Sequence, residues 1–306
     1  MMLRNYLFLL AIGCIWGSQF IFQQMAVHDL PPIWVGAGRS FVGFITLLLI
    51  CKILRLKGQK GWSQWVKFSL VGLLEATIPF VFVAWGQQYL NTSVAAILMG
   101  TIPFFTIILS PLIIRGGAIT AAGLGSIILG FSGLIVLFYP DLVTGSGAIN
   151  LPGAAAIVFS SACFAIALLV IKGITSGHPL VIARNILAAA SFQTVLLAIF
   201  IAPITTLHVT QLSVLAVLYL GILCAGFVYV LYVVLIRDAG PVFTSLTNYL
   251  VPIIGVLLGA SIKKEIIPLN TWAALAVILM AVAFKQIVEK LNKKQGKKLK
   301  PISGSP

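Results

Sequence analysis

Apolar runs of about 20 residues follow one another along the chain, and they determine the solvent in which it can fold. A helix needs about 20 predominantly apolar residues to cross the roughly 30 Å hydrocarbon core of a bilayer. The first run is too long for the apolar part of a signal peptide, so it counts as a helix. We therefore predict an all-α integral membrane protein with ten transmembrane helices. Their ranges are 6–27, 33–54, 66–90, 93–113, 119–139, 152–173, 179–202, 212–236, 242–261 and 267–288.

The scarcity of charge supports this interpretation. Only 8% of the residues are charged and 60% are hydrophobic, whereas soluble domains carry about 25% charged residues. The four cysteines lie far apart inside apolar runs, without clustered histidines or carboxylates. We therefore expect no metal site and no cofactor. Paired carboxylates and the common hydrolase and nucleotide-binding motifs are also missing from the sequence, so an enzyme is not expected.

The basic residues predict the orientation of the chain. With the amino terminus in the cytoplasm, sixteen lysines and arginines lie in or beside cytoplasmic connections, and only Lys263 and Lys264 lie on the other side. The positive-inside rule then places both termini in the cytoplasm. The net charge of +14 therefore indicates contact with anionic lipid rather than nucleic acid. The sixteen are Arg4, Lys52, Arg55, Lys57, Lys60, Lys67, Arg115, Lys172, Arg237, Lys285, Lys290, Lys293, Lys294, Lys297, Lys298 and Lys300.

The two halves of the chain share a pattern. A shift of 149 residues places Pro103 on Pro252, and a shift of 148 places Trp16 on Phe164. A nearly constant offset over five helices indicates a repeat. Because five is odd, the second copy enters the membrane from the opposite side, so the repeat is inverted. We predict one five-helix repeat in residues 1–140, a second in 141–290, and a basic cytoplasmic tail in 291–306.

Three motifs carry a family resemblance. They are CIWGSQF at 14–20, GRSF at 38–41 and AWGQQYL at 84–90, which leads to Pro103. Over residues 5–288 the sequence resembles the EamA-type transporters of the drug/metabolite transporter superfamily. The resemblance implies a secondary transporter in the cell inner (cytoplasmic) membrane that works by alternating access. It further implies a central cavity lined by helices one to four and six to nine, and export of amino acids or related amines.

Glu75 is the one acid placed deep inside an apolar run. It lies nine residues from the start of its run, which is about 13 Å along a helix. A charge at that depth costs about 3 kcal/mol, so the carboxylate needs a cationic partner or a proton. It could form a structural ion pair with Arg39, or it could couple transport to protons or bind substrate charge. Helical spacing predicts one cavity face, formed by Glu75, Pro79, Phe82 and Gly86.

Polar side chains also line the first helix. Trp16, Gln19 and Gln23 follow one another at helical spacing. Tryptophan prefers the membrane interface, so Trp16 at mid-depth needs a partner for its indole N–H. Buried glutamines are costly for the same reason. The two glutamines either join neighbouring helices or form a wall of the substrate cavity.

Prolines and polar residues mark the later helices. Pro79, Pro103 and Pro252 each remove a backbone hydrogen bond, so we expect a helix break at each. Thr101 precedes the second proline, and Asn248 precedes the third at a depth near the middle of its run. A loosened helix with a polar side chain is typical of transporter binding sites. In the eighth run, tyrosines 229 and 232 contribute either to the site or to an interfacial belt.

The expected function combines these residues. Glu75 binds a proton or a cationic group of the substrate. The substrate-binding set is expected to be Trp16, Gln19, Gln23, Arg39, Phe82, Thr101, Tyr229, Tyr232 and Asn248. The expected partners are a small-molecule substrate, the lipid bilayer and protons. Two alternatives stay open, namely a passive facilitator or channel for small polar solutes, and an importer of a cationic metabolite such as a quaternary amine.

Overall fold

The structure is a computed structural model. It describes residues 2–58, 61–114, 119–144, 149–171, 174, 177–203, 209–244 and 246–294. Helices account for all regular secondary structure in these ranges, which confirms the predicted all-α class. Within them, nine helical stretches are long and apolar enough to cross a membrane, and Thr247–Ser261 is a shorter apolar helix. The predicted tail falls outside the described residues from 295 onward.

The helices follow the predicted runs closely. The first half contains α1 (Met2–Asp29), α2 (Pro32–Ile53), α3 (Trp62–Gly72), η1 (Leu73–Thr77), α4 (Ile78–Gly86), α5 (Thr92–Met99), α6 (Ile102–Ile113) and α7 (Ala121–Thr144). The second half contains α8 (Leu151–Ile171), α9 (Pro179–Ile201), α10 (Gln211–Tyr219), η3 (Leu220–Phe227), α11 (Val228–Thr244), α12 (Thr247–Ser261) and α13 (Leu269–Lys294).

Two long helical stretches contain a π-helical segment at their centre. The segment η1 joins α3 to α4, and η3 joins α10 to α11. Each π turn takes up more residues than an α turn, so the side chains beyond it are rotated relative to a regular helix. Glu75 lies in the first segment and Cys224 in the second. The regular spacing assumed for the third run therefore does not hold beyond Glu75.

The three prolines affect their helices differently. Pro79 lies in the first turn of α4, directly after η1, and Pro103 lies in the first turn of α6, after the break that separates it from α5. Pro103 is tolerated because the N–H groups in the first turn of a helix need no helical partner. Pro79, by comparison, lies in a helical stretch that continues from η1 into α4. Pro252, by contrast, lies inside α12, and the helix continues through it. The predicted break at Pro252 is therefore wrong.

The boundary before the ninth run also differs from the prediction. Residues 242–244 belong to α11, and α12 begins only at Thr247. The charges at 237 and 238 end an apolar run but not a helix, and Asp238 pairs with Arg4 of α1 at 2.5 Å. Asn248 lies in the first turn of α12.

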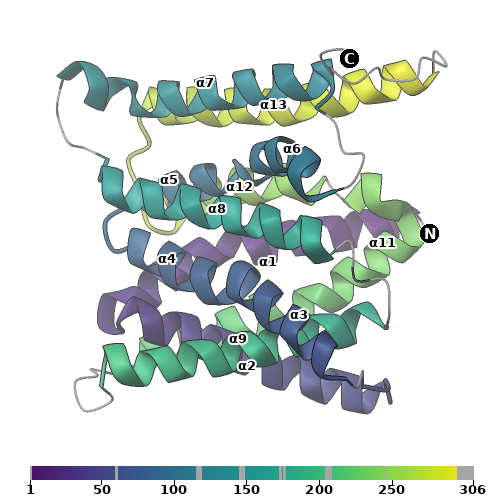
Figure 1. The fold of residues 1–306 in the computed structure, drawn as a ribbon. Coiled ribbons are helices and arrows are strands. Elements are labelled where there is room, and N and C mark those ends of the chain that lie inside the picture. Colours follow the sequence, from purple (N-terminus) through teal and green to yellow (C-terminus); the bar gives the residue numbers. More distant parts are fainter. Residues whose placement is uncertain are drawn as a thin grey trace.

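The helices pack side by side in pairs that combine both halves of the chain (Figure 1). α7 packs on α13 along one edge of the bundle, and α2 packs on α9 along the other. In the first pair, the hydroxyl of Ser126 donates to the carbonyl of Ala281 at 2.7 Å, and the amide of Asn270 donates to the carbonyl of Leu137 at 2.9 Å. Early residues of α7 thus meet late residues of α13, so the two helices are antiparallel.

The same direction holds for two further pairs. The indole N–H of Trp34, early in α2, donates to the carbonyl of Ala202 at the end of α9, at 2.7 Å. A Cβ added at Gly43 would lie 3.2 Å from the side chain of Leu187, further toward the start of α9. α5 and α12 are likewise antiparallel by their glycine contacts. In all three pairs, the two helices hold equivalent places in the predicted halves.

Acidic side chains tie the two halves together at one end of the bundle. The carboxylate of Glu265, between α12 and α13, accepts the backbone N–H of Thr92 at 2.7 Å and that of Ser93 at 3.1 Å, and it also accepts the Ser93 hydroxyl. Asp29, at the end of α1, accepts the hydroxyl of Thr210, which caps α10. Such charge-assisted bonds satisfy helix starts that lack helical partners. This end of the bundle is therefore closed by contacts between the halves.

Candidate functional site

Arg39 of α2 is a buried cation held by neutral groups. Its side chain is only 5% exposed. One terminal nitrogen donates to Oε1 of Gln19 at 2.6 Å, and the other donates to Oε1 of Gln23 at 3.0 Å. The guanidinium carbon lies 4.0 Å from the centre of the Phe80 ring, which is cation–π geometry. The Nε atom is buried without a hydrogen-bond partner.

The glutamines of the first helix join neighbouring helices, which is one of the two roles that the sequence left open. Besides accepting from Arg39, Gln23 donates to the backbone carbonyl of Phe80 at 3.4 Å. A third glutamine, Gln87, donates to the carbonyl of Phe20 at 2.9 Å. These bonds join α1 to α4 and its C-terminal end, while Gln19 and Gln23 also fix the orientation of the guanidinium.

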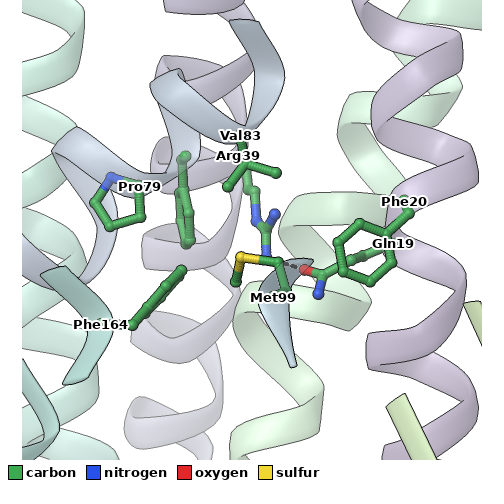
Figure 2. Close-up of a pocket in the computed structure, with 8 residues that line it drawn as sticks. Gln19, Phe20, Arg39, Pro79, Val83, Met99 and Phe164 are labelled. Atoms are coloured by element: carbon green, nitrogen blue, oxygen red, sulfur yellow. Dashed lines mark hydrogen bonds between the residues drawn. The ribbon is translucent and has the colours of Figure 1, made fainter. Parts of the chain in front are cut away.

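A small cavity adjoins this guanidinium (Figure 2). The volume that the centre of a water molecule can occupy in it is about 10 Å³, so the cavity has room for about one water. In Figure 2, Arg39 reaches toward Gln19 and Met99, while Pro79 and Phe164 lie on the opposite side. Apart from Arg39 and Gln19, the wall is apolar. The lining residues are Gln19, Phe20, Arg39, Pro79, Phe80, Val83, Met99 and Phe164.

Five of these lining residues were not predicted from the sequence. For Phe164 a signal existed, because the repeat aligns it with Trp16. Met99 ends α5 directly before the helix break at Gly100 and Thr101, so the break itself was the available signal. Phe20, Phe80 and Val83 are ordinary apolar residues of their helices, and sequence periodicity alone could not separate them from core residues.

Glu75 has a hydroxyl partner rather than a cationic one. The hydroxyl of Tyr229 in α11 donates to its Oε1 at 2.7 Å, and its Oε2 is buried without a hydrogen-bond partner. Arg4 forms an ion pair with Asp238, and no described acid lies within ion-pair distance of Arg39, nor any described cation within that distance of Glu75. The ion pair between Glu75 and Arg39 that the sequence left open is therefore not formed in this structure.

Trp16 lies near the same part of α11. Its indole N–H donates to the carbonyl of Cys224 in η3 at 3.2 Å, which supplies the partner that its depth required. Its ring lies 5.4 Å from the ring of Tyr232. Trp16, Glu75, Tyr229 and Tyr232 thus form one aromatic and acidic cluster, which we call the Glu75 cluster. It brings together residues from α1, η1 and α11.

Three residues of the predicted substrate-binding set lie elsewhere. Phe82 is 40% exposed and its ring lies 5.5 Å from that of Phe159, which is also exposed. The π segment rotates α4, so Phe80 and Val83 face the cavity in its place. Thr101 is buried, but its hydroxyl donates to the carbonyl of Leu98 at 2.7 Å. Asn248 is exposed in the first turn of α12.

Comparisons with known proteins agree with this architecture. The chain is 27% identical over 276 residues to an uncharacterized inner membrane transporter, YedA, of Escherichia coli (strain K12), covering 90% of this chain and 88% of the relative. It is 21% identical over 277 residues to an uncharacterized transporter, YoaV, of Bacillus subtilis (strain 168), covering 88% and 92%. A solved crystal structure shares the fold with a TM-score of 0.67 at 16% identity, covering 94% and 98%.

A family match extends over most of the sequence. The EamA-like transporter family matches twice, over residues 3–139 and 151–285. Together with the long apolar helices, the match identifies a multi-pass membrane protein that transports small solutes and is not an enzyme. The chain therefore belongs to the EamA-like transporter family.

Proposed function

We propose that this protein is a secondary transporter that moves small metabolites across the cell inner membrane by alternating access, with proton coupling through Glu75. The observation that carries the proposal is a pair of ionisable groups, the buried Arg39 and the half-buried Glu75, with which no opposite charge among the described residues pairs. Burying an unpaired charge is costly, and ionisable groups inside membranes are typical of substrate and proton pathways. The proposed substrates are amino acids or related amines, moved outward, as the resemblance to the family implies.

The proposed architecture is ten spans in two inverted repeats, residues 1–140 and 141–290, followed by the basic tail. The double family match supports it. So do the three antiparallel contacts between helices in equivalent places, because an inverted repeat makes such helices run in opposite directions. The third and eighth spans also share a central π segment. Rocking of one repeat against the other would then open the site to each side in turn.

The proposed orientation has both termini in the cytoplasm, and cysteine labelling tests it. Lys57→Cys and Ile266→Cys each place a thiol at an exposed position of a different connection. In a Cys14→Ser background, which removes the exposed native thiol, a membrane-impermeant maleimide added to intact cells is expected to label Ile266→Cys alone. Lys57→Cys is expected to react only after the membrane is opened. The reverse pattern would contradict the orientation.

A carrier explains the site better than a passive channel. A channel needs a continuous polar pore, whereas the cavity beside Arg39 has room for about one water and an apolar wall. The ties of Glu265 and Asp29 close one end of the bundle. In the proposed cycle these contacts break when the site opens to that side. Glu75 takes up a proton in one half of the cycle and releases it in the other.

Counterflow in proteoliposomes tests the proposed transport. Vesicles that contain the full-length protein are loaded with a mixed pool of amino acids and amines, and isotope-labelled compounds are added outside one at a time. A carrier is expected to accumulate its labelled substrate transiently, because the unlabelled substrate inside drives exchange. Protein-free vesicles are the control. Flux without saturation and without transient accumulation would favour the passive facilitator instead.

A further inference from the structure

The charge of Arg39 is the strongest unexplained feature of the cavity. An arginine keeps its charge in proteins and has five N–H donors. Here Gln19 and Gln23 accept from the two terminal nitrogens, but both acceptors are neutral amide oxygens. The Nε donor is buried and has no hydrogen-bond partner. The guanidinium is therefore fixed in position, and its charge and the N–H donors that bond to neither glutamine, Nε among them, are left for another group.

The surroundings of Arg39 indicate what that group is. The guanidinium lines the cavity, and apart from Gln19 the other lining side chains are apolar. Phe80 stacks on the guanidinium, and Phe164 and Pro79 lie across the cavity from it (Figure 2). A guanidinium fork matches a carboxylate in both charge and geometry. The apolar wall matches a hydrocarbon body beside that carboxylate.

We propose that Arg39 binds the carboxylate group of the transported solute, and that the apolar wall of the cavity holds a short hydrocarbon body attached to it. This inference rests on the proposed transport function and specifies its substrate class. The feature that this site requires is a carboxylate attached to an apolar group, and both a simple carboxylic acid and an amino acid can supply it. An amine on the substrate is not required by this site.

The size of the cavity places a condition on binding. In this structure the cavity holds about one water, so a solute enters only in a more open conformation. The lining residues come from α1, α2, α4, α5 and α8. Relative movement of these helices enlarges the cavity, and alternating access supplies that movement. Gln19 and Gln23 hold the guanidinium meanwhile, so that the carboxylate meets a donor that is already oriented.

Four compounds that share one carbon skeleton test the carboxylate and the amine of the solute separately. Leucine carries a carboxylate and an amine, 4-methylpentanoate carries only the carboxylate, leucinamide only the amine, and 4-methylpentanamide neither. The readout is the Tm of the full-length protein in detergent, since a ligand that binds the folded state raises it. We expect leucine and 4-methylpentanoate to raise Tm, and the two amides to leave it unchanged. Stabilisation by leucinamide equal to that by leucine would overturn the inference.

Substitutions at Arg39 assign the effect to this side chain. Arg39→Gln is expected to weaken binding of 4-methylpentanoate by about 10- to 100-fold, the effect of losing a charge-assisted hydrogen bond. Arg39→Lys is expected to recover part of it, because lysine keeps the charge but not the fork. Arg184→Gln is the matched control, since Arg184 lies in α9 and bonds to Asn185. Unchanged affinity in Arg39→Gln would contradict the inference.

Gln19→Glu tests the same point in a variant that keeps the cation. The new carboxylate lies where the amide oxygen now accepts from Arg39, so it neutralises the guanidinium from within the protein. We expect this variant to fold and to lose the Tm response to 4-methylpentanoate. An undiminished response would refute the role of Arg39 even if Arg39→Gln proved unstable.

Comparison with counterflow separates this inference from the transport proposal. Counterflow of leucinamide but of neither carboxylate would leave the carrier intact and refute the carboxylate site. A rise in Tm with both carboxylates, lost in Gln19→Glu, would support the site even if vesicles showed no counterflow of any compound. In that second case it is the transport proposal that fails.

Discussion

Glu75→Gln is expected to abolish the response of transport to an imposed pH gradient. Glutamine has nearly the same shape, and its Oε1 can still accept from the Tyr229 hydroxyl that now bonds to Glu75. It cannot take up or release a proton in the neutral range. With one proton moved per solute, each pH unit supports about tenfold accumulation in the wild type. The variant is expected to equilibrate its substrate and to accumulate none.

The measurement uses proteoliposomes with and without a pH gradient, and counterflow is measured in parallel. Counterflow in Glu75→Gln confirms that the variant is folded and inserted. Glu75→Asp keeps a titratable group and is expected to retain the pH response. Asp238→Asn is the matched control, because it removes a carboxyl that pairs with Arg4 rather than one in the Glu75 cluster. An unchanged pH response in Glu75→Gln would disprove proton coupling through this residue.

Gly86→Ala is expected to destabilise the protein by about 1–3 kcal/mol, the range for overpacking a close contact. Gly86 ends α4, where this helix packs on α8. A Cβ there would lie 2.7 Å from the carbonyl oxygen of Gly153 and 2.8 Å from a side-chain carbon of Ile157. The nearest atom belongs to the backbone, so it cannot turn aside and α4 must move away from α8.

Thermal unfolding in detergent measures this effect. Gly58→Ala is the matched control, because its Cβ would meet only the end of the Arg184 side chain, at 3.5 Å, which is ordinary contact. A Tm for Gly86→Ala equal to that of the control would show that α4 and α8 are not held as closely as described. Since α4 also carries Pro79, Phe80 and Val83 of the cavity wall, displacement of this helix is expected to weaken binding of 4-methylpentanoate as well.

Sequence reasoning succeeded where one residue or one short window carries the information. Glu75 and Arg39 stand out because charge is rare in apolar runs. In the structure Arg39 is buried, Glu75 is half-buried, and the two are not paired with each other. Trp16 at mid-depth required a hydrogen-bond acceptor, and it has one. Pro103 marks a real helix break because it lies where α6 begins.

It failed where the answer depends on how a helix is rotated or on what lies opposite. Phe82 was expected at the site from regular helical spacing, but the π segment before it turns Phe80 and Val83 toward the cavity instead. The ninth helix was expected to begin at residue 242, but residues 242–244 belong to α11 and α12 begins at Thr247. A hydropathy profile reveals neither the rotation of α4 nor the boundary between α11 and α12.

That this chain is a bundle of membrane-length apolar helices with two exceptional ionisable side chains follows from its amino-acid order alone. Hydropathy over about 20 residues is a local property, so it can be read directly from the chain. The partners of those side chains depend instead on the tertiary structure. Glu75 bonds to Tyr229, 154 residues further along the chain, and Trp16 bonds to the carbonyl of Cys224, 208 residues further along. Such contacts depend on helix packing and on the rotation introduced by η1 and η3, which no local pattern encodes.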